Sequence, residues 1–441
     1  MKHLHIKNPT LQFALPVICE SVLSTTMNLV FSSFIGGISG SSLTVISQGN
    51  MIITLIVAFL CIFTTGSSVL CARLLGAGEQ REASRVVEQA LLLSGIFASA
   101  IMTLCLIFTS PLLRLLMPNA ETAVLAEGSA YFRVLILSLP FLALTNTMVS
   151  VLRASGDSRT SMVINVTVGI LQLLFAFLFL KVLALNVAGA GLTYLLCRAC
   201  GMALAVYVLR HSHRYMLSRQ QLFRLHWPTA KRIFHIGIPA SIESVFVQAG
   251  YLTAGSMVIG LGAFEAAAYN VANTLYSFAA LPQGIFSAIA MATIGHLIGA
   301  KEYQKAKKNG WQLWGLAILS VLVLNTLLYV LRSHLTPLYS ADPAVQTAAA
   351  SAITIALLMN IPGASLNTLI PQLQAGGAVK TVMFITLFGV WVVRLPLTWL
   401  FCYHWTWGAK GVFLANAIAL YSRLVITTIC FVRGKYLYMR V

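Results

Sequence analysis

The sequence predicts an all-α polytopic membrane protein with twelve transmembrane helices in two similar six-helix lobes. Of its 441 residues, 58% are hydrophobic and only 9% are charged, whereas a soluble domain carries about 25% charged residues. Apolar runs of about 20 residues, each long enough to cross a bilayer as a helix, recur along the whole chain. The second half of the sequence also repeats the motifs of the first half in the same order.

The apolar runs and the polar breaks between them place the spans. The runs do not alternate polar and apolar residues, so helices are expected rather than membrane β-strands. Four prolines, Pro140, Pro282, Pro362 and Pro396, lie in or near spans and are expected to bend them. The predicted spans cover residues 10–35, 43–66, 90–116, 126–152, 160–183, 187–210, 233–258, 266–295, 310–332, 345–372, 381–403 and 409–433.

The distribution of charge predicts the orientation. The net charge is +18, but the basic residues gather in short clusters between spans, so we expect no nucleic-acid partner. With a cytoplasmic N-terminus, most lysines and arginines fall on the inner side, as the positive-inside rule requires. We therefore expect a multi-pass protein of the plasma (inner) membrane, surrounded by the lipid bilayer, with its N- and C-termini in the cytoplasm.

The two halves of the chain form a duplication. LPVICESV (15–22) matches IPASIESV (238–245) at an offset of 223. LTNTMVSVLRASGDSRTSM (144–162) matches SLNTLIPQLQAGGAVKTVM (365–383) at an offset of 221. Because each half holds six spans, both copies enter the membrane in the same direction, which makes the repeat parallel.

The repeat sets the expected domains. We expect an N-lobe with spans 1–6 (1–209), a basic cytoplasmic linker (210–232) and a C-lobe with spans 7–12 (233–441). Since one chain already contains both lobes, we expect a monomer.

The segment LRASGDSRTSM (152–162) is the predicted cytoplasmic turn between spans 4 and 5. Gly156 and Asp157 suit a tight turn, and Arg153 and Arg159 lie at the inner interface, where arginines anchor helices. The second copy contains GGAVKT, which lacks the spacing of a phosphate-binding loop, so no nucleotide site is expected.

These motifs resemble those of the multidrug and toxic compound extrusion (MATE) family. LRASGDSRTSM is similar to that family's L-R-G-x-G-D-T-R-x-P-M turn. ARLLGAGEQREASR (72–85), with Gly76 and Gly78, resembles its L-G-A-G-(D/E) loop, and VVRLPLTWLF (392–401) resembles its R-(I/L)-P-L stretch. The resemblance covers essentially the whole chain.

The resemblance implies a secondary active efflux transporter. Such a protein exports small organic compounds, often cationic and drug-like, in exchange for H⁺ or Na⁺, while its two lobes rock around a central cavity. One residue departs from the pattern. Phe31, in NLVFSSFIG (28–36), stands where many family members carry an aspartate, so the family's N-lobe ion site does not carry over at that residue.

Two other carboxylates are candidates for ion coupling. Of the 11 acidic residues, only Glu20 and Glu243 lie well inside spans, and they occupy the same repeat position. A carboxylate at bilayer depth is costly and therefore a functional candidate. Ser24 and Asn28 follow Glu20 at spacings of four and share its helix face. Burial disfavours a charged carboxyl, which favours H⁺. The alternative ion is Na⁺, for which Glu20, Ser24 and Asn28 would supply oxygen ligands. A neutral Glu20 used only for packing is the structural alternative.

Arg394 in span 11 is the predicted partner of Glu243. At a rise of 1.5 Å per residue, Glu243 lies roughly 17 Å beyond Arg232, and Arg394 lies about 21 Å beyond Lys380. The two side chains are therefore expected at similar depth. If they form an ion pair, Glu243 is a structural residue rather than a titrating one.

Buried asparagines are candidates for lining the substrate cavity. Asn50 and Asn273 are repeat mates in spans 2 and 8, and Asn146 and Asn367 are mates in spans 4 and 10. Asn165 stands alone in span 5. Hydrogen bonding between helices is the structural alternative for each.

Other functions remain open at this point. A flippase for lipid-linked oligosaccharide or a cell-wall precursor shares the wider superfamily's architecture, but it needs a basic cavity for pyrophosphate, and only Arg198, Arg394 and Arg423 are in-membrane cations. A membrane enzyme is disfavoured, because H-E-x-x-H is absent, the histidines lack ligand spacing and the repeat is spread evenly over the chain. A channel is a further, less favoured alternative. We expect no enzymatic activity, no metal site, and no cofactor other than the transported H⁺ or Na⁺.

Overall fold

The computed structural model describes residues 9–36, 40–116, 122–211, 224–338 and 342–439, and every regular element in this part of the chain is a helix. Within it, 12 helical segments are long and apolar enough to cross a membrane. This confirms the predicted fold class. The chain divides into two compact units, residues 1–241 and 242–441, which are described separately.

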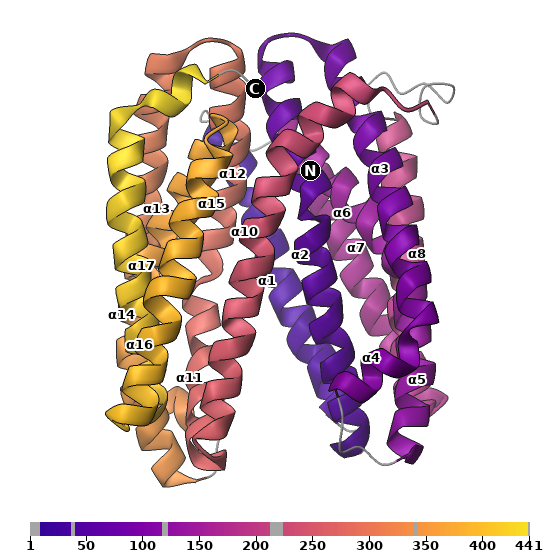
Figure 1. Cartoon of the computed structure of the whole chain (residues 1–441), viewed down its shortest axis with the longest axis vertical. Coiled ribbons are helices and arrows are strands. Elements are labelled where there is room, and N and C mark those ends of the chain that lie inside the picture. Colours follow the sequence, from indigo (N-terminus) through magenta and orange to yellow (C-terminus); the bar gives the residue numbers. More distant parts are fainter. Residues whose placement is uncertain (1–8, 37–39, 117–121, 212–223, 339–341, 440–441) are drawn as a thin grey trace, which may run out of the picture. The chain divides into compact units, whose positions relative to one another are not determined.

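The first unit is built around α6. This helix packs on α2, α3 and α8, while α7 packs on α1 and α8 (Figure 1). The first half of α10 also belongs to this unit. The elements are α1 (Pro9–Gly36), α2 (Gly40–Gly76), α3 (Gln80–Ile107), α4 (Thr109–Leu116), α5 (Thr122–Leu137), α6 (Leu139–Ala154), α7 (Ser158–Ala176), the π-helix η1 (Phe177–Val182), α8 (Asn186–His211) and α10 (Trp227–Gly260).

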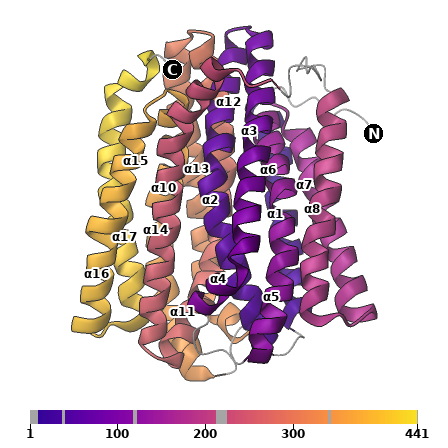
Figure 2. The same cartoon turned by 45° about the vertical axis from the view of Figure 1, so that its right-hand side comes forward.

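The second unit repeats this packing around α14. This helix packs on α12, α13 and α17 as α6 packs on α2, α3 and α8, and Figure 2 shows α16 and α17 side by side. The elements after α10 are α11 (Ala263–Ala279), α12 (Leu281–Gly299), α13 (Tyr303–Leu335), η2 (Thr336–Leu338), α14 (Pro343–Ala375), α15 (Val379–Leu387), η3 (Phe388–Arg394), α16 (Leu395–Trp399), η4 (Leu400–His404), α17 (Gly408–Arg433) and η5 (Lys435–Tyr438).

Two predicted spans are interrupted at prolines. Span 4 consists of α5 and α6, which meet at Ser138 just before Pro140. Span 8 consists of α11 and α12, which meet at Ala280 just before Pro282. Because proline lacks an N–H and clashes with the preceding turn, it starts a new helix at both places. Pro362, in contrast, lies inside the unbroken α14.

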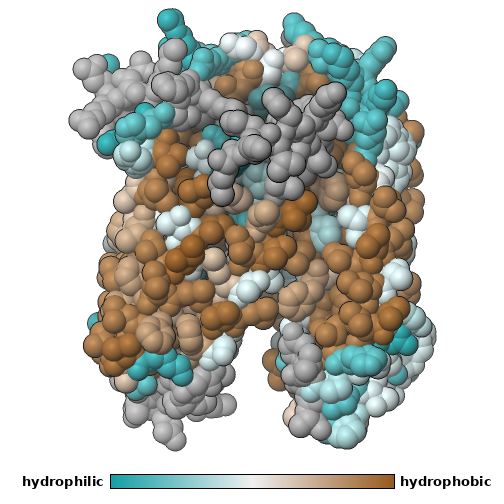
Figure 3. Space-filling view, turned by 180° about the vertical axis from the view of Figure 1, so that it is seen from behind, coloured by the Kyte–Doolittle hydropathy of each residue, from teal (hydrophilic) through white to brown (hydrophobic). Residues whose placement is uncertain are grey.

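The surfaces of the helices suit a lipid environment. Large apolar side chains along their middles are exposed, among them Ile96 (54%), Leu319 (59%) and Val323 (61%). Figure 3 shows hydrophobic residues covering the middle of the helices and hydrophilic residues at their ends. In lipid such apolar surface needs no further burial.

The end of the predicted linker is fixed to the first unit. Residues 212–223 of the linker lie outside the described residues. Beyond them, Nε2 of Gln89 in α3 donates to the carbonyl of Arg224 (2.8 Å), and the backbone N–H of His226 donates to Oε1 of Gln89 (2.9 Å). The two units meet inside α10 rather than at the linker, so the limits predicted from the sequence, 1–209 and 233–441, stay a prediction.

Candidate ion-coupling and cargo-binding sites

Glu20 lies buried in α1 and pairs with a residue of the predicted turn. Its Oε1 atom forms an ion pair with Nη2 of Arg153 and accepts a 2.5 Å hydrogen bond from Nδ2 of Asn165. Its Oε2 atom is buried and has no hydrogen-bond partner among the described residues. The carboxylate is therefore only half satisfied.

The local sequence explains how both partners reach Glu20. Arg153 occupies the last turn of α6. Gly156 then adopts a left-handed conformation (φ +80°), which glycine takes without steric cost. The side chain of Asp157 caps the start of α7, and α7 runs back along α1. Asn165, about two turns into α7, thereby faces Glu20.

The remaining motif residues shape the ends of helices. Gly76 ends α2, and Gly78 follows it with φ +79°. Lys301, the repeat mate of Gly78, takes the same left-handed conformation (φ +60°) although it is not a glycine. Arg159 lies exposed in the first turn of α7. These residues build turns, and Arg153 alone among the motif residues contacts a coupling candidate.

Glu243 in α10 has the same partners by repeat position. Its Oε1 accepts from Oγ1 of Thr386 (2.8 Å) and its Oε2 accepts from Nε2 of Gln374 (3.1 Å). At the repeat offset of 221, Gln374 corresponds to Arg153 and Thr386 corresponds to Asn165. Both oxygens of Glu243 are therefore satisfied, by neutral groups.

The predicted pair of Glu243 and Arg394 is wrong. Arg423 of α17 takes that place, because its Nη2 donates to Oγ1 of Thr386 (2.8 Å) beside Glu243. The guanidinium of Arg394 instead lies over the ring of Tyr251, 4.2 Å from its centroid.

The error has a simple physical cause. Tyr251 is eight residues beyond Glu243, and Arg394 is eight residues beyond Thr386, so each lies about 12 Å further along its helix. The segment that carries Thr386 and Arg394 packs along α10. Thr386 therefore lies beside Glu243, and Arg394 lies beside Tyr251. The depths of Glu243 and Arg394 predicted from the sequence were counted from the basic residues at the span ends, and they did not include this shift.

The other members of the predicted N-lobe site do not join Glu20. Ser24 is half-buried and Asn28 is exposed, and no hydrogen bond within the described residues links either to the carboxylate. Asn28 is two turns away, about 12 Å along the helix. Arg153 and Asn165 complete the site instead.

The asparagines proposed to line a cavity have different surroundings. Nδ2 of Asn50 lies 3.5 Å from the hydroxyl of Tyr194. Asn367 donates to Oε1 of Gln283 (3.0 Å). Asn146 is half-buried and Asn273 is exposed. Lining of a cavity by these side chains stays a prediction.

A chain of buried amides in the second unit was missed by the sequence analysis. Nε2 of Gln283 donates to Oδ1 of Asn360 (2.9 Å), and Nδ2 of Asn360 donates to Oδ1 of Asn325 (2.8 Å). All three side chains are buried. At the repeat offset of 221, Asn360 corresponds to Leu139, so the chain has no equivalent in the first unit. The signal in the sequence was an amide side chain inside an apolar span. The prediction selected mainly asparagines that have a repeat mate, and it therefore did not include these three residues.

The chemistry that these groups offer is proton and ion handling rather than bond making. Each unit holds a carboxylate at the same repeat position inside a span, Glu20 or Glu243, with hydrogen-bond donors around it. Within the described residues, no three His, Cys, Asp or Glu side chains lie close enough together to hold a metal ion.

The chain is similar to known proteins along most of its length. The MatE family model matches residues 16–178 and 239–400. The chain is 22% identical to the "Probable multidrug resistance protein NorM" of Thermotoga maritima, over 98% of this chain and 93% of the relative. It is 24% identical to the "Probable multidrug resistance protein YoeA" of Bacillus subtilis, over 94% and 91%.

Solved structures show the same fold. A structure described as "Crystal structure of MATE in complex with MaD3S" superimposes with a TM-score of 0.88 at 19% identity, over 97% of this chain and 95% of that one. One described as an outward-facing conformation of a multidrug resistance MATE family transporter superimposes with a TM-score of 0.87 at 18% identity, over 98% and 96%.

Proposed function

We propose, from the premise that the chain belongs to the MATE family of multidrug efflux transporters, that it exports small organic compounds in exchange for H⁺. The location that we propose is the plasma membrane, with both termini in the cytoplasm, where the basic loops favour them. Transport follows alternating access, in which the two six-span lobes expose the cargo to one side and then to the other.

The half-satisfied carboxylate of Glu20 is the observation that carries this proposal. A charged carboxylate inside a span is costly, and here Oε2 lacks any hydrogen-bond donor among the described residues. A proton can bind at Oε2 while Oε1 keeps Asn165. Protonation removes the charge that holds Arg153, so one proton can control a contact between α1 and α6.

The surroundings of Glu20 favour H⁺ over Na⁺. Sodium requires several oxygen ligands, whereas the contacts on Oε1 are a guanidinium and an amide N–H₂. The guanidinium of Arg153, which pairs with Oε1 of Glu20, also repels a second cation at this carboxylate. A proton needs only the free lone pair of Oε2.

Glu243 serves as the structural counterpart. Both of its oxygens accept hydrogen bonds from neutral side chains, and these bonds tie α10 to the segments that carry Gln374 and Thr386. The same repeat position therefore couples ions in the first unit and fixes helix packing in the second.

Purified protein in proteoliposomes tests the proposal. Fluorescent organic cations, the cargo class that the resemblance implies, are the first probes, with a H⁺ gradient and a Na⁺ gradient imposed separately. We expect movement under the H⁺ gradient for the wild type and for Glu243→Gln, the matched repeat-mate control. Glu20→Gln should elute as the wild type does on size exclusion yet move no probe. Normal gradient-driven export by Glu20→Gln would contradict the assignment.

A further inference from the structure

A pocket of about 490 Å³ lies at one end of the second unit, away from the residues discussed for ion coupling. Its walls come from α11, α14, α17 and the turn between η4 and α17. Spans 8, 10 and 12 begin at this end, so the orientation proposed above places the pocket at the outer surface of the membrane.

Two opposite charges line this pocket without pairing. Glu265 lies half-buried in the first turn of α11, and Lys410 lies exposed in the first turn of α17. Neither forms an ion pair among the described residues. A ligand that carries an ammonium and an acidic group can therefore meet both side chains at once.

The carboxylate of Glu265 is fixed in position before any ligand binds. Its Oε2 accepts a 2.6 Å hydrogen bond from the backbone N–H of Ala409. Gly408, at φ +57°, packs so closely on the carboxylate that a β-carbon at this position would overlap it. No hydrogen bond to Oε1 occurs within the described residues, so this oxygen can accept from an ammonium.

Aromatic rings surround the mouth of the pocket. Trp407 lines it, and the ring of Trp407 stacks on Phe401 (5.3 Å between centroids) and meets Trp405 (4.9 Å). Trp405 and Trp407 are 46% and 47% exposed. Because tryptophans gather where lipid headgroups meet the hydrocarbon, these rings place the mouth at headgroup depth. An exposed tryptophan ring also attracts an ammonium.

The floor of the pocket is apolar and continues toward the middle of the spans. Ile355 and Leu414 line it and lie about 18 Å and 9 Å from the starts of α14 and α17. One turn further along the same helix faces, Leu358 (51%) and Ile418 (39%) are exposed. A ligand with an apolar chain can therefore extend from the charged mouth along these helices.

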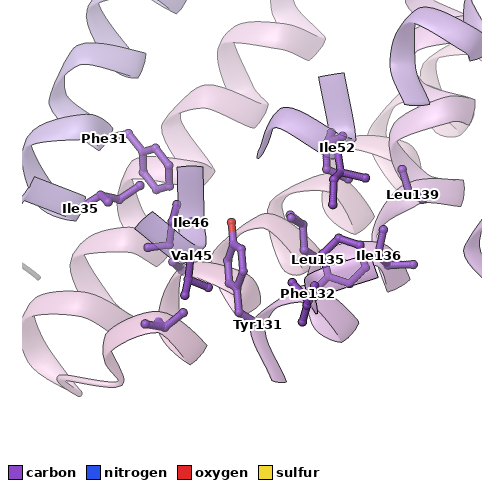
Figure 4. Close-up of a cluster of buried hydrophobic side chains, with 14 of the residues drawn as sticks. Phe31, Ile35, Val45, Ile46, Ile52, Tyr131, Phe132, Leu135, Ile136 and Leu139 are labelled. Atoms are coloured by element: carbon purple, nitrogen blue, oxygen red, sulfur yellow. The ribbon is translucent and has the colours of Figure 1, made fainter. Parts of the chain in front are cut away.

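The first unit has no such pocket at the matching repeat position. At an offset of 220, Lys410 and Trp407 correspond to Ala190 and Val187. Both mates are buried in the closed apolar cluster around Tyr131, which Figure 4 shows. The charges and the tryptophan are thus additions of the second unit, which the repeated fold does not require.

We propose that this pocket binds the headgroup of phosphatidylethanolamine from the surrounding bilayer. The ammonium donates to Oε1 of Glu265 beside the ring of Trp407, and Nζ of Lys410 meets the phosphate. One acyl chain lies along Ile355 and Leu414, which a free headgroup would leave uncovered. The lipid is a bound component of the second unit rather than cargo, so the proposal goes beyond export and does not depend on it.

Phosphatidylethanolamine and phosphatidylcholine with identical acyl chains test the proposal. Both are zwitterions with the same phosphate, but the choline group has no N–H to donate. Native mass spectrometry of the purified full chain in detergent should show the first phosphatidylethanolamine binding about fivefold more tightly, since charge-assisted hydrogen bonds are the strong ones. Equal binding, or tighter binding of phosphatidylcholine, would overturn the proposal.

Variants separate the two charges. Glu265→Gln keeps an acceptor for the N–H of Ala409 but should bring the two lipids within about twofold of each other. Lys410→Gln should weaken both lipids alike and leave the preference unchanged, because both carry the phosphate. Glu302→Gln is the matched control, since this exposed carboxylate pairs with Lys305 at the other end of the unit. A preference that survives Glu265→Gln would overturn the proposal, and size exclusion checks that each variant folds.

A soluble headgroup distinguishes a lipid from a free zwitterion. Glycerophosphoethanolamine carries the same charges without acyl chains. We expect that an equal concentration of it does not displace bound phosphatidylethanolamine, because it cannot cover the apolar floor. Displacement would show that the pocket takes a soluble zwitterion and would overturn the assignment to lipid.

Discussion

Replacing Arg153 by glutamine tests whether Glu20 carries a charge in the span. The change gives the first unit the residue that the second has at this position, Gln374. It removes the guanidinium from Oε1 and leaves Asn165 as the one described donor on the carboxylate. A charged Glu20, whose side chain is 7% exposed, then lies in the span without a cation.

The structure sets the size of the effect. Removing one partner of a buried ion pair costs about 3–5 kcal/mol. The side chain of Arg153 is 31% exposed, so solvent already screens part of the pair, and we expect a loss of about 2 kcal/mol in the free energy of unfolding. Replacing both Glu20 and Arg153 by glutamine leaves no buried charge and should cost less than Arg153→Gln alone.

Unfolding of the purified protein in detergent, at neutral and at acidic pH, measures these differences. The loss caused by Arg153→Gln should shrink in acid, because protonation of Glu20 removes the charge that lacks a partner. Arg159→Gln, in the same turn but exposed, should change the free energy by no more than about 0.5 kcal/mol. A loss that is equal at both pH values, or losses that simply add in the double variant, would refute the reasoning.

Three further changes test the second unit and the turns. Thr386→Val should lower the free energy of unfolding by about 1–3 kcal/mol because Glu243 loses a donor, whereas Thr386→Ser should be close to the wild type; equal losses in a thermal unfolding series would contradict this. Gly156→Ala should cost about 1–2 kcal/mol at φ +80°, while Gly255→Ala, a helical position with open space around it, should be neutral or stabilising in the same assay. Burial raises the pKa of Tyr436 above the ordinary value of about 10; stability is therefore full below that value and falls above it as the unfolded chain ionises. Tyr436→Phe should gain relative to the wild type only as the pH rises above about 10, and a constant difference in unfolding temperature would argue against it.

Much of the fold follows from the order of the residues. Uninterrupted apolar runs specify helices in lipid, because every backbone polar group must be satisfied within the segment. Pro140 and Pro282 mark the breaks in spans 4 and 8. The break positions themselves, at Ser138 and Ala280, and the π-helical turns of span 11 depend on packing against neighbouring helices, which the local sequence does not specify.

The cluster around Glu20 was predicted only in part. Glu20, Arg153 and Asn165 were each singled out, for three different reasons, and the structure brings them together. Helix register decides such contacts, and a shift of eight residues placed Arg394 against Tyr251 rather than Glu243. A signal was nevertheless present, since the partners of Glu20 and Glu243 occupy matching repeat positions.

The measurement that tests the central claim most directly is proton movement driven by cargo. Liposomes containing the purified protein and a trapped pH-sensitive dye receive cargo on one side only, with no imposed ion gradient. Downhill movement of cargo should drive protons in the opposite direction in the wild type and in Glu243→Gln, but not in Glu20→Gln. Proton movement of wild-type size in Glu20→Gln, or none in the wild type while cargo crosses, would contradict coupling at Glu20.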